Sequence, residues 1–179
     1  EPMSPIEVSE LYSNFASGGF NLKPKAVIGV LDSAGAPLSH HSIVLKQTIN
    51  PVISNTLNRS LELTMRRGTG RFSSFSKAGV AGKTGTTNDN RDSWFAGFDD
   101  NKLAVFWVGR DDNKSTGLSG ASGALKLWDA SLRRIGNSPL SIPTDETFVD
   151  IEYSSGKMAR PTCADTVATI FTTSTTTKS

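Results

Sequence analysis

The sequence is poor in the side chains that build disulfides and metal sites. Its 179 residues include one cysteine, Cys163, and two adjacent histidines, His40 and His41. One thiol cannot form an internal disulfide or a cysteine metal cluster, so we interpret it as a tolerated free thiol. Adjacent histidines on a strand point to opposite faces, which is the wrong spacing for a metal pair. We therefore expect no metal site.

Long apolar runs and a dominant charge are also missing. No stretch reaches the ~18 apolar residues of a membrane span, and residues 1–4 lack the basic and apolar regions that open a signal peptide. The formal net charge is +2, and no basic cluster is longer than Arg66-Arg67, which gives no argument for nucleic acid. A hydrophobic fraction of 36% is typical of a globular domain with one core.

The opening residues predict a helix. Ser4 can cap it, Pro5 suits its first position, and Glu7 stands three residues after Ser4 and completes a capping box. Glycines at positions 18 and 19 end it. The predicted apolar stripe comprises Ile6, Val8, Leu11 and Phe15.

A strand hairpin and a second helix are predicted next. Residues 25–32 (KAVIGVLD) indicate a strand, with residues 33–35 as its turn and residues 42–47 as the returning strand. Asn50 caps the following helix, and Pro51 occupies its first position. The predicted buried face of this helix comprises Val52, Ile53, Leu57, Leu61, Leu63 and Met65.

Three strands close together complete the predicted sheet. Residues 80–87 are rich in glycine and threonine, whereas residues 93–98 and 103–108 are aromatic and apolar. Residues 99–102 form a hairpin turn between the last two strands, and short loops imply antiparallel pairing. A third helix is predicted at about residues 122–134. This order predicts an α+β fold in which helices cover an antiparallel sheet.

The composition changes after Gly136. Residues 137–165 contain three of the eight prolines and few apolar runs, and residues 172–179 (TTSTTTKS) are of low complexity. We therefore expect one domain at residues 1–136 and a C-terminal extension at residues 137–179, of which the last eight residues are disordered.

The chemistry is concentrated in residues 79–98 (GVAGKTGTTNDNRDSWFAGF). Lys83 supplies a positive charge, and the hydroxyls of Thr84 and Thr86 can donate to a carboxylate. Gly85 lets a substrate backbone approach, so a peptide could add to the strand. Strand alternation puts Lys83 and Thr84 on opposite faces, and whether twist or an edge position brings them to one ligand stays open.

The triplet at residues 83–85 is one of three signatures of the penicillin-recognising serine enzymes. The longer string at residues 83–89 (KTGTTND), followed by RD at 91–92 and WFAGF at 94–98, resembles the class A, bifunctional penicillin-binding proteins, especially the 1B-like group. Three flanking segments add to the resemblance, which extends over about residues 4–135: RGTG at 67–70, VFWVG at 105–109, and Gly123-Ala124 leading to Trp128.

The resemblance implies the C-terminal part of a transpeptidase domain with a partial penicillin-binding, β-lactamase-like fold. A serine would attack the D-Ala-D-Ala amide of a peptidoglycan stem peptide, pass the acyl group to a neighbouring stem, and be trapped by β-lactams. The parent protein would act at the periplasmic face of the cytoplasmic membrane, anchored by an N-terminal helix absent here. No metal or organic cofactor is implied.

The resemblance also implies roles for particular residues. The catalytic roles fall to Lys83, which tunes the electrostatics, and to the backbone N–H of Thr86, which supplies half of the oxyanion hole. The substrate-binding residues are Lys83, Thr84, Gly85, Thr86 and Thr87. The loop beside the site is expected to hold Asn88, Asp89 and Arg91. We expect an ion-pair cluster of Asp89, Arg91 and Asp92 to shape that loop, with direct substrate contact as the alternative.

The nucleophile of the family is missing. The pattern S-x-x-K occurs at residues 74–77 and 154–157, but neither match opens a helix upstream of the strand, and S-x-N occurs nowhere. We therefore expect this chain alone to be inactive. Without the helices that carry the nucleophile, apolar surface on the sheet is expected to favour self-association or domain swapping.

Three other functions are alternatives to a transpeptidase fragment. A phosphate-binding loop would need glycine where Lys77 stands, and a helix after the motif. A β-lactamase or carboxypeptidase of the same fold shares the short triplet but not the longer string. A non-catalytic binding domain stays open for the isolated chain.

Overall fold

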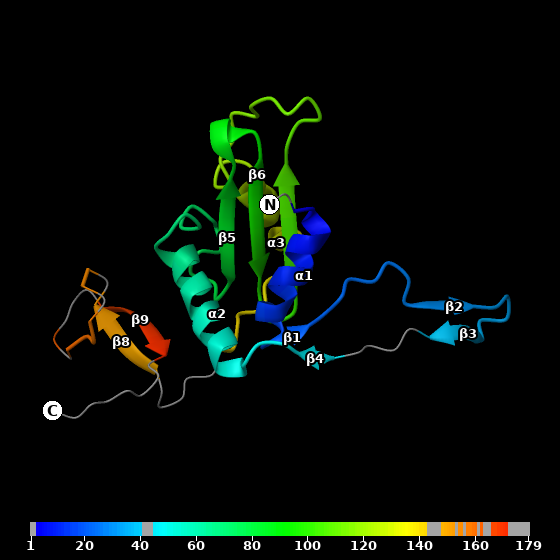
Figure 1. Ribbon diagram of the computed structural model, residues 1–179, viewed down its shortest axis with the longest axis horizontal. Helices are drawn as coiled ribbons and strands as arrows, with labels where there is room; N and C mark the ends of the chain where they lie inside the picture. Colours follow the sequence, from blue (N-terminus) through cyan, green and yellow to red (C-terminus); the bar gives the residue numbers. More distant parts are fainter. Residues whose placement is uncertain are drawn as a thin grey trace.

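The computed structural model describes residues 3–40, 45–142, 148–152, 154–155, 157–160, 162 and 166–171. Three helices and a central sheet form the body, and two hairpins extend from it (Figure 1). The helices are α1 (Pro5–Ala16), α2 (Pro51–Arg66) and α3 (Ala124–Ile135), with a short 3₁₀ turn at Asn88–Asn90. The strands are β1 (Phe20–Asn21), β2 (Gly29–Leu31), β3 (Pro37–His40), β4 (Lys46–Gln47), β5 (Ala81–Thr86), β6 (Ser93–Phe98), β7 (Leu103–Val108), β8 (Phe148–Glu152) and β9 (Thr166–Phe171).

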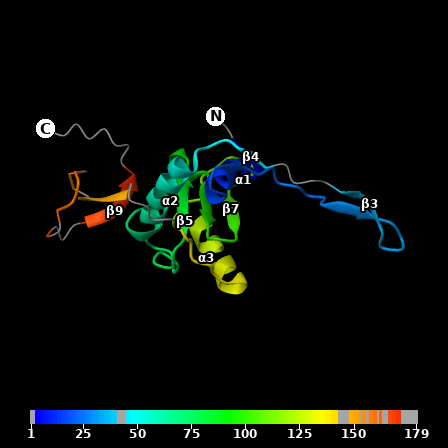
Figure 2. The same cartoon turned by 90° about the horizontal axis from the view of Figure 1, so that it is seen from below.

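The body has three layers around an antiparallel sheet with the strand order β5-β6-β7. Viewed from below, α1 and α2 lie on one side of the sheet and α3 on the other (Figure 2). The contacts agree, since α1 packs on β6 and β7, α2 on β5, and α3 on β6 and β7. The predicted α+β fold with a helix-covered antiparallel sheet is therefore confirmed.

Each face of the sheet carries its own core. Phe95 faces α3, where its ring lies 5.1 Å from that of Trp128, and both side chains are buried. Phe98 faces the opposite way and packs with Leu61 of α2, while Tyr12 and other residues of α1 cover this cluster. Burying a Phe or Leu side chain stabilises a fold by roughly 1.5–3 kcal/mol. Alternation along β6 therefore fixes both helix layers on the sheet.

Helix α1 begins as predicted, but only part of its predicted apolar stripe is covered. Ser4 and Glu7 form the capping box, whereas Ile6 and Leu11 of the predicted stripe are 61% and 44% exposed. The buried positions are Ser13 and Asn14. Ser13 Oγ donates to the Leu22 carbonyl, and Asn14 Oδ1 accepts from Thr48. Ile6 and Leu11 were placed wrongly because polar side chains with partners just beyond β1 and β4 occupy part of the interface, whereas Phe15 packs against the core around Phe98 as predicted.

A smaller correction applies to α2, since Leu61 and Met65 of its predicted face are buried as expected. Its cap at Asn50 is confirmed, but Ile53 of the predicted buried face is 60% exposed. Ser54 and Asn58 are buried instead, and both side chains donate to the Phe15 carbonyl at 3.1 and 2.9 Å. This carbonyl belongs to the last turn of α1, where carbonyl groups lack partners inside the helix. Polar residues of α2 thus satisfy the end of α1.

The hairpin after α1 pairs differently from the prediction. Strand β2 pairs with β3 at residues 37–40, so the chain returns earlier than residues 42–47. The turn closes there because Asp32 Oδ1 accepts the N–H groups of Ala34 and Ala36. Strand β4 pairs with β1 instead, and residues 41–44 lie outside the described residues. Figure 1 shows this β2–β3 arm extending away from the body.

The C-terminal extension begins with residues that are bonded to the body. The backbone N–H of Ser138 donates to Asp99, and that of Leu140 donates to the Gly79 carbonyl at 2.7 Å. Further on, β8 and β9 form a hairpin whose strand β9 lies against α2. The domain boundary at residue 136 stays a prediction. Cys163 and residues 172–179 lie outside the described residues.

Asp99 at the β6–β7 turn predicts an acid-sensitive stability. Burial raises the pKa of its carboxyl, but N–H donors from Ser138, Asn101 and Lys102 and the Lys102 ammonium outweigh burial, so the pKa is lowered from 3.8. A depressed pKa stabilises the fold above the unfolded value, and this stability is lost as pH falls through the folded value. We expect Asp99→Asn to destabilise the chain by about 1–3 kcal/mol at pH 7.

Urea unfolding at pH 7 and pH 3 measures this difference. The difference should shrink toward acid, because the unfolded carboxyl binds its proton at a higher pH than the folded one, and the stability contributed by the folded charge is lost as pH falls. The exposed Asp111, changed to Asn, is the matched control and should stay near the wild type at both pH values. An Asp99→Asn effect that is equally large at pH 3 would contradict the assigned role of the charge.

Candidate active-site strand

Strand β5 carries the predicted site residues and lies at the edge of the sheet. The N–H of Thr87 donates to the Asp92 carbonyl, which continues the ladder with β6. In an antiparallel ladder, bonded and non-bonded residues alternate. Lys83 and Gly85 therefore bond to β6, while the N–H and C=O groups of Thr84 and Thr86 face outward. Among the described residues no backbone group pairs with them across this open edge.

The side chains of β5 alternate between the two faces. Lys83 stands opposite Ala96 in the register, and Gly85 stands opposite Trp94, on the face that α1 and α2 cover. Thr84 stands opposite Phe95, on the face toward α3. At the open edge the two residues are joined through the backbone, since Lys83 Nζ donates to the outward carbonyl of Thr84 at 2.8 Å. Whether the Lys83 ammonium and the Thr84 hydroxyl reach one ligand stays a prediction, because the ammonium lies at the open edge and the hydroxyl donates to Thr69.

The two threonine hydroxyls have different surroundings. Thr84 is only 8% exposed, and its hydroxyl donates to Thr69 Oγ1 at 2.5 Å. Thr86 is exposed, and its hydroxyl accepts the Gly120 N–H at 2.8 Å. Within the described residues the proton of the Thr86 hydroxyl has no acceptor. Of the two, Thr86 is therefore the one whose hydroxyl can donate to an arriving carboxylate.

The loop after β5 is held by a different cluster from the one predicted. Asp89 and Arg91 form the predicted ion pair, with 3.2 Å between Asp89 Oδ2 and the Arg91 guanidinium. Asp92 does not join it. Its carboxylate accepts from the Thr87 hydroxyl and from Trp107 Nε1, both at 2.9 Å. Asp92 therefore ties Thr87, which follows β5, to Trp107 of β7.

Asn88 and the charged loop residues are exposed, and the backbone here is unusual. Asp89 has a φ of 59°, in the left-handed region that few side chains other than Asn and Asp adopt. The Asn90 carbonyl accepts both the N–H and the hydroxyl of Thr116. The loop is thus fixed at its base and open to solvent at its tip.

Among the residues with a described structure, neither S-x-x-K match contacts the open edge. The Ser74 hydroxyl donates to Asp129 and accepts from Arg133, both on α3. Ser154 lies in the C-terminal hairpin, and Gly156 of that match lies outside the described residues. No described contact joins either serine to β5. The interpretation of both matches as coincidence fits these positions.

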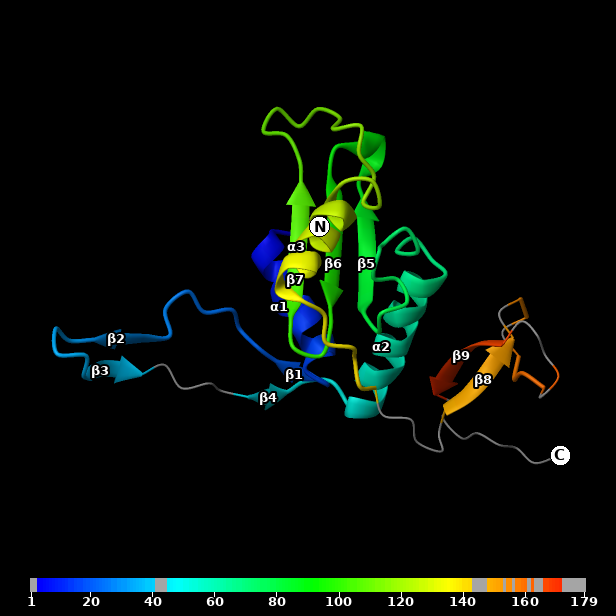
Figure 3. The ribbon, with the colours of Figure 1, turned by 180° about the vertical axis from the view of Figure 1, so that it is seen from behind.

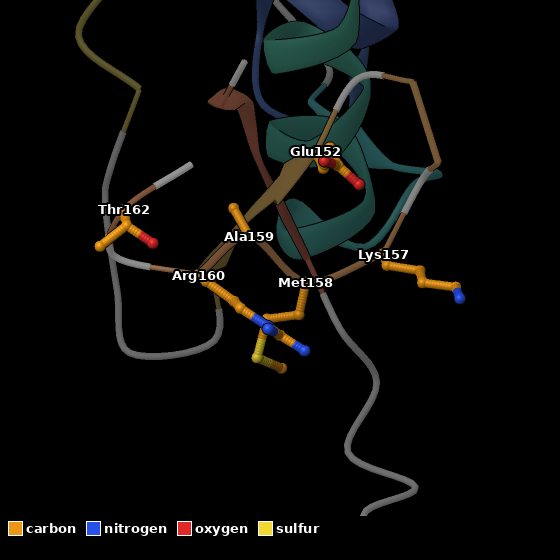
Figure 4. A pocket seen from close by; sticks show the side chains of 6 residues that line it. All are labelled: Glu152, Lys157, Met158, Ala159, Arg160 and Thr162. Carbon is orange, nitrogen blue, oxygen red and sulfur yellow. The ribbon is translucent and has the colours of Figure 1, made fainter. Parts of the chain in front are cut away.

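The described surface has a hollow near the end of β5 and another in the C-terminal hairpin. One of about 540 Å³ adjoins the end of β5, and it is lined by Met3, Pro5, Val8, Thr87, Asp92, Trp94 and Trp107. The other, of about 390 Å³, lies in the C-terminal hairpin and is lined by Glu152, Lys157, Met158, Ala159, Arg160 and Thr162. Figure 4 shows Lys157 and Arg160 of the second hollow leaving the chain at separate places around it. The predicted site residues contribute only to the first hollow.

Comparison with known proteins gives the family. Residues 2–126 match the penicillin binding protein transpeptidase domain, and the chain belongs to this family. Within it the chain belongs with the class A proteins. Penicillin-binding protein 1B of Vibrio cholerae serotype O1 is 36% identical over 154 residues, which is 85% of this chain and 20% of that relative. The chain thus spans about a fifth of the length of the curated relatives it matches.

Solved structures agree on the fold. Penicillin-binding protein 1A from Haemophilus influenzae matches with a TM-score of 0.74 at 22% identity, over 94% of this chain and 32% of that chain. The D,D-transpeptidase domain of a peptidoglycan glycosyltransferase from Eggerthella lenta matches with a TM-score of 0.58 at 25% identity, over 73% of this chain and 32% of that one. Both confirm a partial transpeptidase fold.

Four residues of the strand's surroundings were missed by the sequence analysis. Thr69 Oγ1 accepts a hydrogen bond from the Thr84 hydroxyl, and the Gly120 N–H donates one to Thr86 Oγ1. Ser93 and Ser119 bond to each other behind the strand. The available signals were the position of Ser93 at the start of an aromatic strand and the place of Thr69 in the RGTG segment at residues 67–70. Among the described residues, no helix is long and apolar enough to cross a bilayer.

Proposed function

We propose that this chain supplies the carboxylate-binding and oxyanion strand of a serine D,D-transpeptidase that cross-links peptidoglycan stem peptides and binds β-lactams. The observation that carries the proposal is the open edge of β5. There the Thr86 backbone faces outward, and Lys83 Nζ lies 2.8 Å from the Thr84 carbonyl. An extended peptide can add to such an edge by pairing with its free N–H and C=O groups.

Each group at the edge has a distinct task in this proposal. The outward N–H of Thr86 donates to the oxyanion that forms when a serine attacks the scissile carbonyl. The Lys83 ammonium moves away from the Thr84 carbonyl and stabilises the negative charge that develops on the substrate. The Thr84 carbonyl can then accept a hydrogen bond from the peptide N–H. The Thr86 hydroxyl donates to the terminal carboxylate, while Thr84 does so only if it releases Thr69. Gly85 and Thr87 keep the strand accessible.

The attacking serine comes from a part of the protein beyond these 179 residues. Ser74 is engaged with α3, and no other serine has the motif near β5. The isolated chain therefore binds weakly and does not react. By the pattern of the family, the complete protein works at the periplasmic face of the cytoplasmic membrane and is anchored there by an N-terminal helix. No metal or organic cofactor takes part in this proposal.

Fluorescent penicillin followed by denaturing electrophoresis tests the proposal. The isolated chain is expected to remain unlabelled. A chimera, in which this chain replaces the matching stretch of penicillin-binding protein 1B of Vibrio cholerae, is expected to be labelled at a serine of the relative's own portion. Denatured chimera is the control. Covalent label on the isolated chain, or none on a folded chimera, would overturn the proposal.

We also propose that the isolated chain self-associates, and the β2–β3 arm is the favoured surface. Sheet residues such as Phe95 and Phe98 are buried, whereas the arm carries five exposed large apolar side chains close together along the chain: Val27, Ile28, Val30, Leu31 and Leu38. Ile28, Leu31 and Leu38 are 83%, 62% and 67% exposed. An isolated two-stranded hairpin is marginally stable in water, and its apolar side chains gain about 25 cal/mol per Å² when covered.

Light scattering over a range of concentrations measures this association. We expect a molar mass that rises above that of the monomer with concentration, and we expect Ile28→Ser with Leu38→Ser to remove the rise. Leu127→Ser on α3, where the side chain is 46% exposed, is the matched control. A monomer at every concentration, or equal effects of the arm and control variants, would contradict the role of the arm.

A further inference from the structure

A buried serine joins the central strand to the start of α3. Ser93 is fully buried, and its hydroxyl makes two hydrogen bonds of 2.8 Å. It donates to the Ser119 carbonyl and accepts the Ala124 N–H. One side chain thus holds both ends of the segment 119–124 that leads into the helix. Ser93 is also the residue of β6 directly opposite Thr86.

The held segment fits against the sheet without room for side chains. A Cβ at Gly123 would lie 2.5 Å from Ser93 Oγ, and a Cβ at Gly120 would lie 2.6 Å from the Gly85 carbonyl oxygen. Glycine permits such close backbone approach. Figure 3 shows the loop before α3 crossing the ends of β5 and β6. Gly120 is thereby placed on the last residues of β5.

From this position Gly120 reaches the end of β5. Its N–H donates to Thr86 Oγ1 at 2.8 Å. This bond fixes the rotamer of Thr86 and occupies a lone pair of its hydroxyl, so the hydroxyl proton stays available for an acceptor outside. No strand pairs with the outer edge of β5 among the described residues. Thr86, whose N–H faces outward, is therefore restrained twice. Strand β6 pairs with β5 on one side, and the segment 119–124 bonds the Thr86 side chain.

We propose that Ser93 is a positioning residue for the oxyanion strand. Its hydroxyl holds the segment 119–124 so that Gly120 clamps the Thr86 side chain, and the clamp keeps the Thr86 N–H in place for the reaction. This inference rests on the proposed function, which assigns that N–H to the oxyanion. A donor must lie 2.7–3.1 Å from the position of the oxyanion, and a misplacement of about 1 Å can cost about 10²-fold in rate.

Amide hydrogen exchange in the full chain tests the clamp. We expect the Gly120 amide to be protected in the wild type and to exchange at least about tenfold faster in Ser93→Ala, since an opening that is 1.4 kcal/mol easier is ten times more populated. Ser60→Ala, at an exposed serine of α2, is the matched control and should leave Gly120 unchanged. A Gly120 amide that exchanges in the wild type like that of an unstructured peptide would overturn the proposal, whatever the variants do.

Acylation of the chimera by fluorescent penicillin separates positioning from binding. We expect Ser93→Ala to lower the maximal acylation rate about 10- to 100-fold and to change the apparent dissociation constant less than about threefold, because the oxyanion forms only in the transition state. Gly120→Ala, which forces the segment off β5, should give the same split and serves if Ser93→Ala does not fold. Ser60→Ala should match the wild type.

The outcomes distinguish the two proposals. A folded wild-type chimera that stays unlabelled refutes the proposed function, and the exchange experiment then still decides whether Ser93 clamps Thr86. Labelling of the wild type with an unchanged acylation rate in folded Ser93→Ala refutes the positioning role alone. So does a rate loss that is matched by an equal loss of affinity.

Discussion

Replacing Asp129 with alanine is expected to lower the free energy of unfolding by about 3–5 kcal/mol. The Asp129 side chain is buried on α3 and accepts three hydrogen bonds from the loop after α2. Oδ1 accepts the Ser73 hydroxyl at 2.5 Å, and Oδ2 accepts the N–H and the hydroxyl of Ser74 at 2.8 and 3.2 Å. Hydrogen bonds to charged groups contribute about 1.5–3 kcal/mol each and are not additive.

The loss of stability is large because alanine leaves the hydrogen-bond donors of Ser73 and Ser74 without their acceptor. The buried Ser73 hydroxyl and the Ser74 N–H would face a cavity without an acceptor, and the loop would leave α3. Urea unfolding of the full chain measures the effect as a lower midpoint at constant slope. Asp111→Ala, at an exposed carboxylate, should stay within about 0.5 kcal/mol of the wild type. An Asp129→Ala loss below 1 kcal/mol would show that water replaces the carboxylate.

Replacing Lys83 with alanine is expected to lower the rate of acylation of the chimera by about 10²–10³-fold, the usual loss when one transition-state stabiliser is removed. The Lys83 side chain is exposed, and within the part of the chain that the structure describes its ammonium bonds only the Thr84 carbonyl of its own strand. Its removal should therefore leave folding nearly unchanged while the positive charge at the edge of β5 disappears. Labelling with fluorescent penicillin, stopped at successive times, gives the acylation rate. Thermal unfolding shows whether the variant is folded.

Lys77→Ala is the matched control for that experiment. Lys77 is an exposed lysine in the loop before β5, so the variant loses the same charge a few residues away from the edge. We expect its acylation rate to change by less than about threefold, since exposed charges act weakly in water. Equal rates for Lys83→Ala and Lys77→Ala would mean that Lys83 contributes only through the net charge.

Local chemistry made much of the fold predictable. The bounds of β6 and β7 agree with the predicted residues 93–98 and 103–108, because aromatic and apolar runs flank a turn rich in Asp and Asn. The caps at Ser4 and Asn50 were also correct, since a capping side chain bonds within its own first turn. The resemblance at residues 83–89 gave the family, which the match over residues 2–126 confirms. The roles of those residues stay proposals.

Predictions failed where a polar side chain finds its partner far along the sequence. Ser54 was not placed in the core because its acceptor, the Phe15 carbonyl, belongs to another helix. The same holds for Asp129, whose partner Ser73 is 56 residues away. Hydrophobic periodicity assigns such positions to the surface, so it also put Ile53 inside.

The sequence by itself determined the helix caps, the central strands, the triplet at residues 83–85 and the lack of an S-x-x-K motif that opens an upstream helix, because each of these is a property of neighbouring residues. Only the tertiary structure decided that β5 lies at an edge, that Lys83 bonds the Thr84 carbonyl, and that Gly120 holds Thr86. The physical reason is that sheet order and hydrogen bonds between distant segments depend on which surfaces are buried together, which no local pattern specifies.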